Sequence, residues 1–104
     1  AEVFRTLWKE RRPTALLAVA DIIAIGVLQA AAEDGIRVPH DLAIIGFDDI
    51  PQARWTTPQL TTIRQPVVEK GEIAAQLLLS VIAGETPRNH NVMLSTELIL
   101  RQSA

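Results

Sequence analysis

Residues 14–49 read TALLAVADIIAIGVLQAAAEDGIRVPHDLAIIGFDD. Within them, residues 15–19 are an unbroken apolar run, short enough to be a strand buried on both faces of a parallel sheet. Residues 21–34 predict a helix that ends at Gly35, because glycine suits the left-handed position after a helix. A second apolar strand is predicted over residues 42–47. Strand, helix and strand in this order predict a βαβ unit with a right-handed crossover.

The flanking residues extend the α/β pattern. Residues 2–11 predict an amphipathic helix that Pro13 stops. After the second strand we expect a loop with one helical turn, an extended segment, a helix, a polar loop and two short strands, over residues 48–60, 61–65, 67–83, 85–91, 92–95 and 97–101. Together these elements predict an α/β fold, a three-layer Rossmann-like parallel sheet.

Composition excludes several classes of protein. The 104 residues are 48% hydrophobic and 21% charged, which suits one globular domain and excludes a disordered tail. The formal net charge of −2 lacks the basic footprint of a nucleic-acid-binding domain. Because the chain has no cysteine, it has no disulfide, thiolate nucleophile or cysteine-based zinc site, which fits a reducing cytoplasm.

The N-terminal residues AEVFRTLWKERRP carry charges throughout and have no apolar core, so they do not predict a signal peptide. They begin in the middle of a helical pattern, from which we expect the chain to be a piece of a longer one. No apolar run is long enough to predict a membrane-spanning helix.

Acidic side chains follow both predicted strands at the sheet edge where ligands bind in open α/β folds. Asp21 follows the first strand, and its carboxylate is expected to cap the next helix in preference to touching a ligand. Asp48 ends the second strand and is predicted to bind a ligand, as an acceptor for hydroxyl or amine hydrogens. Asp49 is expected to turn the chain through a hydrogen bond to its own loop.

Catalytic and metal-binding patterns do not emerge from the sequence. Adjacent carboxylates such as Asp48 and Asp49 point in different directions, which argues against an acid–base pair. His40 and His90 are isolated in predicted loops, and we interpret both as surface residues and not as metal ligands. No phosphate-binding loop, dinucleotide fingerprint or nucleophile elbow occurs, so we expect neither an enzyme nor a cofactor.

The helix predicted over residues 21–34 is apolar nearly all round. Only Gln29 and Glu33 form a narrow polar strip, flanked by Ile22 and Gly26. Such a helix is buried on all sides, either by other segments of a longer chain or by a second subunit, and we favour the second subunit. Trp55, in a loop between prolines, is either an anchor of that interface or a plug within its own loop.

Three basic residues, Lys9, Arg11 and Arg12, cluster near the end of the first predicted helix. Cations at this position compensate the partial negative charge of a helix C-terminus. We therefore do not interpret them as a nucleic-acid contact.

The series from Arg12 to Pro66, RPTALLAVADIIAIGVLQAAAEDGIRVPHDLAIIGFDDIPQARWTTPQLTTIRQP, resembles the carboxyl-terminal part of the LacI/GalR family of bacterial transcription regulators. The helix containing GEIAAQLLLSVIAGE and the closing STELILRQS resemble the same family. The resemblance covers the chain from about residue 12 to its end. It is specific because several unrelated elements occur in the same order.

The resemblance implies a periplasmic-binding-protein-like effector domain of two α/β lobes, of which this chain is an incomplete fragment. Residues 1–66 and 92–104 would belong to the carboxyl-terminal lobe, and residues 67–91 to the amino-terminal lobe. Asp48 would bind the effector. Ala20, where the family often carries a polar ligand-binding side chain, puts that contact in doubt and suggests an altered effector preference.

The resemblance also implies a function and its partners. The chain would be the ligand-sensing and dimerisation portion of a repressor that binds a sugar or, less commonly, a purine. Asp48, Asp21 and Ala20 would lie at the effector, whereas Ile22, Ile25, Gln29 and Trp55 would form the homodimer interface. Operator DNA would be bound only by a helix-turn-helix head outside this chain. A periplasmic sugar-binding protein of a transporter is the alternative.

Separating the helix at residues 67–83 from its lobe would expose its apolar stripe, which includes Leu77, Leu78, Val81 and Ile82. We therefore predict that an intermolecular arrangement buries this stripe.

Overall fold

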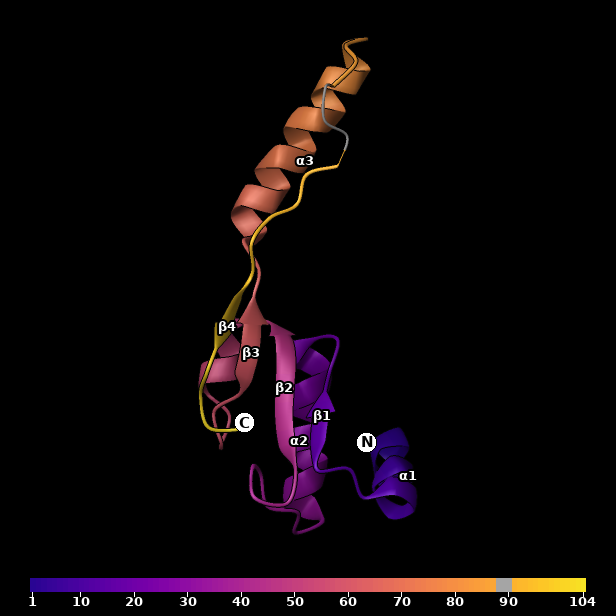
Figure 1. Ribbon diagram of the computed structural model, residues 1–104, viewed down its shortest axis with the longest axis vertical. Coiled ribbons are helices and arrows are strands. Elements are labelled where there is room, and N and C mark those ends of the chain that lie inside the picture. Colours follow the sequence, from indigo (N-terminus) through magenta and orange to yellow (C-terminus); the bar gives the residue numbers. More distant parts are fainter. Residues whose placement is uncertain (88–90) are drawn as a thin grey trace. The chain divides into compact units, whose positions relative to one another are not determined.

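The computed structural model describes residues 1–87 and 91–104. Along the chain it contains helix α1 and strand β1, helix α2 and strand β2, the short 3₁₀ helix η1, strand β3, helix α3 and strand β4 (Figure 1). Their bounds are Glu2–Arg11, Ala15–Leu17, Asp21–Glu33, Ala43–Asp48, Pro51–Arg54, Thr61–Arg64, Val67–Ile82 and Glu97–Ile99. The predicted α/β class is confirmed.

The four strands form one sheet in the order β1-β2-β3-β4. β1 pairs with β2, and β2 with β3, in parallel, so the predicted βαβ unit is confirmed. The predicted parallel arrangement holds for β1, β2 and β3, whereas β4 pairs antiparallel with β3, so the sheet is mixed. The direction reverses because the chain leaves the sheet after Arg64 and returns at Glu97, which is the register partner of Arg64.

Helix α2 lies along one face of the sheet, and the core forms where it meets β2 (Figure 1). Ala24 and Ala31 of α2 are fully buried, as are Leu42 and Ile44 at the start of β2. Alanine side chains let a helix approach a sheet closely. α2 ends before Gly35, which takes the predicted left-handed conformation with φ +70°.

Helix α1 packs against α2 through one apolar face and one cation. Phe4 is buried in the core, and Trp8 packs against that core as a partly buried residue. Arg5 forms ion pairs with Glu33 and Asp34 at 2.5 and 2.9 Å. The helix ends at Arg11, followed by Arg12 in the left-handed region with φ 46°, just before Pro13 as predicted.

Two predicted strand regions differ from the structure. β1 is shorter than predicted, and residues 92–95 form no strand. Strands require a backbone partner, and the register of β3 with β4 ends at the pair of Arg64 with Glu97. The single helical turn predicted after β2 is present as η1.

The chain divides into two compact units. The first contains Ala1–Arg64 and Glu97–Ala104, and the second contains Gln65–Thr96. In the second unit α3 buries none of its residues, and Leu78, Val81 and Ile82 are 61%, 56% and 72% exposed. The assignment of residues 67–91 to another lobe, and the intermolecular burial of this stripe, stay predictions.

Candidate functional site

The carboxyl ends of β1 and β2 bring three acidic residues together at one edge of the sheet. Asp21 begins α2 directly after β1, Asp48 ends β2, and Asp49 follows it. Their environments differ strongly. One carboxylate is fully buried, one is clamped by two arginines, and the third lies on a strained backbone.

Asp21 is fully buried and acts as a structural anchor. Its Oδ1 accepts a 2.5 Å hydrogen bond from Thr62 Oγ1, and its Oδ2 accepts one at 2.9 Å from the backbone N–H of Ile50. The predicted helix cap is wrong, because Ala20 is the N-cap of α2 and no side chain caps it. The carboxylate instead joins α2 to β3 and to the loop after β2. Because Asp21 is fully buried, a ligand could reach its carboxylate only if neighbouring atoms moved.

Gly46 makes this anchor fit. A Cβ atom added at Gly46 would lie 2.2 Å from Asp21 Oδ1 and 3.0 Å from Leu60 Cδ2. Both distances are too short for ordinary contacts, so only glycine allows β2 to approach the Asp21 carboxylate this closely.

Asp49 is held by two arginines, one from each of the last two segments of the sheet. Its Oδ2 accepts from Arg64 Nε and its Oδ1 from Arg101 Nη2, both at 2.7 Å. Only 4% of the Asp49 side chain is exposed, and 10% of that of Arg101. Arg101 Nη1 also donates to the carbonyl of Leu60 at 2.9 Å. The carboxylate thus pairs across the fold, and the predicted bond to its own loop is wrong.

These contacts set the ionisation of the cluster. Burial acts to raise the pKa of Asp49, but the hydrogen bonds and charges of Arg101 and Arg64 outweigh it and hold the pKa below its usual value. The same hydrogen bond raises the pKa of Arg64. Asp49 is therefore a charged structural group at neutral pH.

Asp48 lies on unusual backbone. Its φ is 128°, and that of Asp49 is 57°, so two successive non-glycine residues occupy conformations that L-amino acids rarely adopt. Such strain costs on the order of 1–3 kcal/mol per residue and collects at functional sites. Asp48 is nevertheless fixed, because it pairs with Arg64 in the sheet register and Asp49 is clamped directly after it.

Ala20 and a small hollow also lie at this edge of the sheet. Ala20 is partly buried and extended, with a methyl group and no polar side-chain atom. A hollow of about 260 Å³ beside the loop is lined by Asp49, Pro51, Arg54 and Trp55. Asp48 is outside that lining, so its contact with an effector stays a prediction.

A second surface contains the residues predicted for the dimer interface. Ile22 is 70% exposed and Trp55 is 72% exposed. A hollow of about 300 Å³ between α2 and the loop after η1 is lined by Ile25, Leu28, Gln29, Ala32, Trp55, Thr56 and Thr57. The fold therefore brings Ile25, Gln29 and Trp55 to one place. Trp55 does not act as a plug in its own loop.

Metal ligands do not gather in the described part of the chain, where no three histidine, cysteine, aspartate or glutamate side chains could hold an ion. His40 is exposed and lies 3.4 Å from Asp41, whereas His90 lies outside the described residues. Among the described helices, none is long and apolar enough to cross a membrane.

Sequence reasoning missed the groups that hold the acidic edge in place, which are Gly46, Thr62, Arg64 and Arg101. Thr62 and Arg101 lie 41 and 52 residues from the carboxylates that they contact. The only local signal was a charged residue, Asp49, placed directly after a buried strand, where a carboxylate needs a partner.

The fold and this edge define an α/β domain in which parallel strands present acidic residues at their carboxyl ends. The periplasmic binding protein-like domain family matches residues 1–104. The chain belongs to that family.

Relatives of known identity confirm the resemblance to LacI-type regulators. The chain is 40% identical over 97 residues to the ribose operon repressor of Haemophilus influenzae, covering 93% of this chain and 29% of that protein. It is 41% identical over 97 residues to the repressor PurR of Salmonella paratyphi B, and the match covers 93% of this chain and 28% of PurR. A structure of the regulator CelR with cellobiose matches 99% of this chain and 32% of its own, with 32% identity and a TM-score of 0.90.

The curated relatives are much longer than this chain. The chain spans less than a third of the length of these curated relatives. The named relatives are transcriptional regulators and not enzymes, and they do not favour the transporter alternative.

Proposed function

We propose that this chain is the ligand-sensing and dimerisation portion of a LacI/GalR-type transcriptional regulator of the cytoplasm. A small effector, with a sugar as the favoured class and a purine as the minority class, would control operator binding by a helix-turn-helix head outside this chain. The observation that carries the proposal is the position of Asp48 on strained backbone at the carboxyl end of β2, directly before the clamped Asp49. The names of the relatives support it, since they include a ribose operon repressor and a cellobiose complex.

Asp48 is proposed as the effector's hydrogen-bond acceptor. A carboxylate accepts bonds from the hydroxyls of a sugar or the N–H groups of a purine. The clamp of Asp49 by Arg64 and Arg101 fixes the backbone directly after Asp48, so little ordering is left to occur when ligand binds. Asp21 would support this edge through its bonds to Thr62 and Ile50. Ala20 would shape the site with a methyl group.

Homodimerisation is proposed through the exposed side of α2 and the loop that follows η1. Ile22 and Trp55 are large apolar side chains with more than two thirds of their surface exposed. Ile25 and Gln29 line the hollow beside Trp55. An aromatic side chain next to an apolar hollow is typical of the residues that dominate binding energy at interfaces.

The regulatory step in this proposal is a coupling of free energies, without chemistry on the effector. Effector bound to the complete protein would favour one arrangement of its lobes. The dimer would transmit that preference to the spacing of two DNA-binding heads.

Calorimetric titration of the complete gene product with pentoses, hexoses, disaccharides and purine bases tests the proposal. We expect one class to bind saturably and Asp48→Asn to weaken it at least tenfold. Asparagine keeps the size of the side chain and tolerates positive φ. Glu10→Gln, an exposed charge change on α1, is the matched control and should leave affinity unchanged. Equal binding by the parent protein and Asp48→Asn would refute the assignment.

A further inference from the structure

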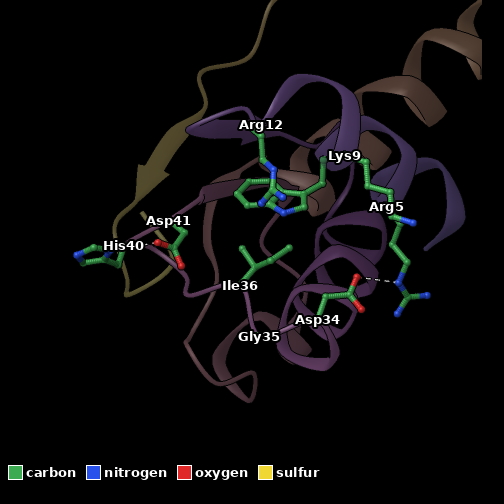
Figure 2. A pocket seen from close by; sticks show the side chains of 9 residues that line it. Arg5, Lys9, Arg12, Asp34, Gly35, Ile36, His40 and Asp41 are labelled. Carbon is green, nitrogen blue, oxygen red and sulfur yellow. Dashed lines mark hydrogen bonds and ion pairs between the residues drawn. The ribbon is translucent and has the colours of Figure 1, made fainter.

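A large hollow of the first unit lies at the end of β2 opposite the acidic edge. It has a volume of about 750 Å³ and lies between the second half of α1 and the segment that joins α2 to β2 (Figure 2). Its lining residues are Arg5, Trp8, Lys9, Arg12, Asp34, Gly35, Ile36, His40 and Asp41. This volume falls within the range of small-molecule sites.

The charges of the hollow leave a positive excess. Asp34 is paired with Arg5 at 2.9 Å, and Asp41 is paired with Arg37 at 2.8 Å. Figure 2 shows Arg5 directed to Asp34 and His40 next to Asp41, with Arg12 near the centre of the view and Lys9 close to Arg5. In the part of the chain that the structure describes, Lys9 and Arg12 enter no ion pair. Two positive charges are therefore available to a ligand.

The hollow also has a flat aromatic wall. The guanidinium carbon of Arg12 lies 5.0 Å from the centre of the Trp8 ring. That ring is set firmly, since its centre lies 6.4 Å from that of the buried Phe4 and it packs against the core. A guanidinium stacked on an indole presents a planar, weakly hydrated cation on which a flat ligand can continue the stack. Ile36, only 9% exposed, adds apolar surface.

Compensation of the helix dipole accounts for basic residues at the end of α1, but not for this arrangement. That role requires only charge near the last turn, and Arg11 meets it without lining the hollow. Arg12 lies one residue further, in a left-handed conformation, with its guanidinium over Trp8. Positive charge, a flat aromatic wall and an open hollow therefore coincide at one place.

We propose that this hollow binds a small phosphate monoester that carries a flat ring system, such as a nucleoside monophosphate. A phosphate monoester carries about −1.5 to −2 charges at neutral pH, which matches the two cations of Lys9 and Arg12. The ring would stack on the Arg12–Trp8 pair. This site does not involve Asp48 and does not depend on the function proposed above.

Calorimetric titration of the complete gene product with adenosine 5′-monophosphate, adenosine and inorganic phosphate tests the proposal. We expect the monophosphate to bind saturably, at least tenfold more tightly than adenosine or phosphate alone. Its affinity should fall as salt is raised, because the cations are exposed to solvent. Failure of the monophosphate to bind saturably would overturn the proposal.

Matched variants locate the binding. Lys9→Gln and Arg12→Gln should each weaken the monophosphate about tenfold, whereas Arg11→Gln, the same charge change outside the hollow, should stay within twofold. An equal loss in Arg11→Gln would show nonspecific attraction to the end of α1. Asp48→Asn should leave monophosphate binding intact, and its loss in that variant would place the ligand at the acidic edge and overturn the proposal.

Fluorescence supplies a readout that a purely electrostatic contact would not move. The 104 residues contain two tryptophans. Replacing every other tryptophan of the complete gene product with phenylalanine, Trp55 among them, leaves Trp8 as the single indole emitter. In that background the monophosphate should quench Trp8 emission saturably, with the same dissociation constant as calorimetry. Unchanged Trp8 emission at saturating ligand would contradict stacking at this wall.

Discussion

The Oδ1 atom of Asp49 accepts a hydrogen bond from Nη2 of Arg101 at 2.7 Å, although the two residues are 52 positions apart in the sequence. The bond joins the loop that follows β2 to the segment that follows β4. Because Arg64 at the end of β3 holds the other carboxylate oxygen, one side chain connects three segments of the sheet. The backbone after Asp48 is thereby fixed by charge pairs within the first unit.

Removing this clamp should destabilise the first unit. Asp49→Ala leaves the 90%-buried Arg101 side chain without its carboxylate. We expect a loss of about 2 kcal/mol in the free energy of unfolding, the typical value of a hydrogen bond to a charged group. Chemical denaturation measures it. Glu97→Ala, which removes only an exposed contact 3.8 Å from Arg64, should change stability little. Equal losses in both variants would contradict a special role of Asp49.

The same clamp should make stability depend on pH in the acid range. The pKa of Asp49 is lower in the folded state than in the unfolded state. The ionised carboxylate therefore contributes its full stabilisation above the unfolded-state pKa, and this stabilisation is lost as pH falls through the folded-state pKa. The unfolded pKa is about 3.9. Asp49→Asn should therefore be less stable than the parent protein at pH 7, and the difference should shrink below about pH 4. A difference that stays constant down to pH 2 would exclude this origin.

Gly46 offers a test of the buried anchor. Gly46→Ala places a Cβ atom against the Asp21 carboxylate and Leu60, so Asp21 or β2 must move. We expect a loss of about 1–3 kcal/mol, the usual cost of overpacking. Gly26→Ala on α2 is the matched control, because nothing lies within 4 Å of its added Cβ and alanine is the better helix former. The midpoint temperature of thermal unfolding should fall in Gly46→Ala and rise in Gly26→Ala.

The proposed dimer surface predicts a change of assembly without a change of fold. Ile22→Asp and Trp55→Ala should each shift the complete gene product towards monomer in sedimentation velocity, because a charge or a cavity would replace apolar contact area. Leu100→Asp, at a 71% exposed apolar residue that follows β4, is the control and should leave the assembly unchanged. A dimer that tolerates both interface variants would place its interface elsewhere.

The order of elements could be predicted because β1, α2 and β2 follow directly from local apolar patterns. Asp21 shows why the site could not. Its position at the start of a helix suggested a cap, yet Thr62 and Ile50 approach from other segments and take both oxygens. The partners of Asp49 and the close approach at Gly46 depend on strand register, which no local pattern reveals. The antiparallel β4 escaped prediction because its direction depends on a partner strand far back in the sequence.

The central claim is that the Asp48 carboxylate binds the effector, and a crystal structure of the complete gene product with its tightest ligand tests it most directly. The account predicts a ligand hydroxyl or amine within about 2.6–3.2 Å of an Asp48 carboxylate oxygen, the range of a hydrogen bond. An occupied effector site in which no ligand atom comes within about 5 Å of Asp48, well beyond any hydrogen bond, would contradict it.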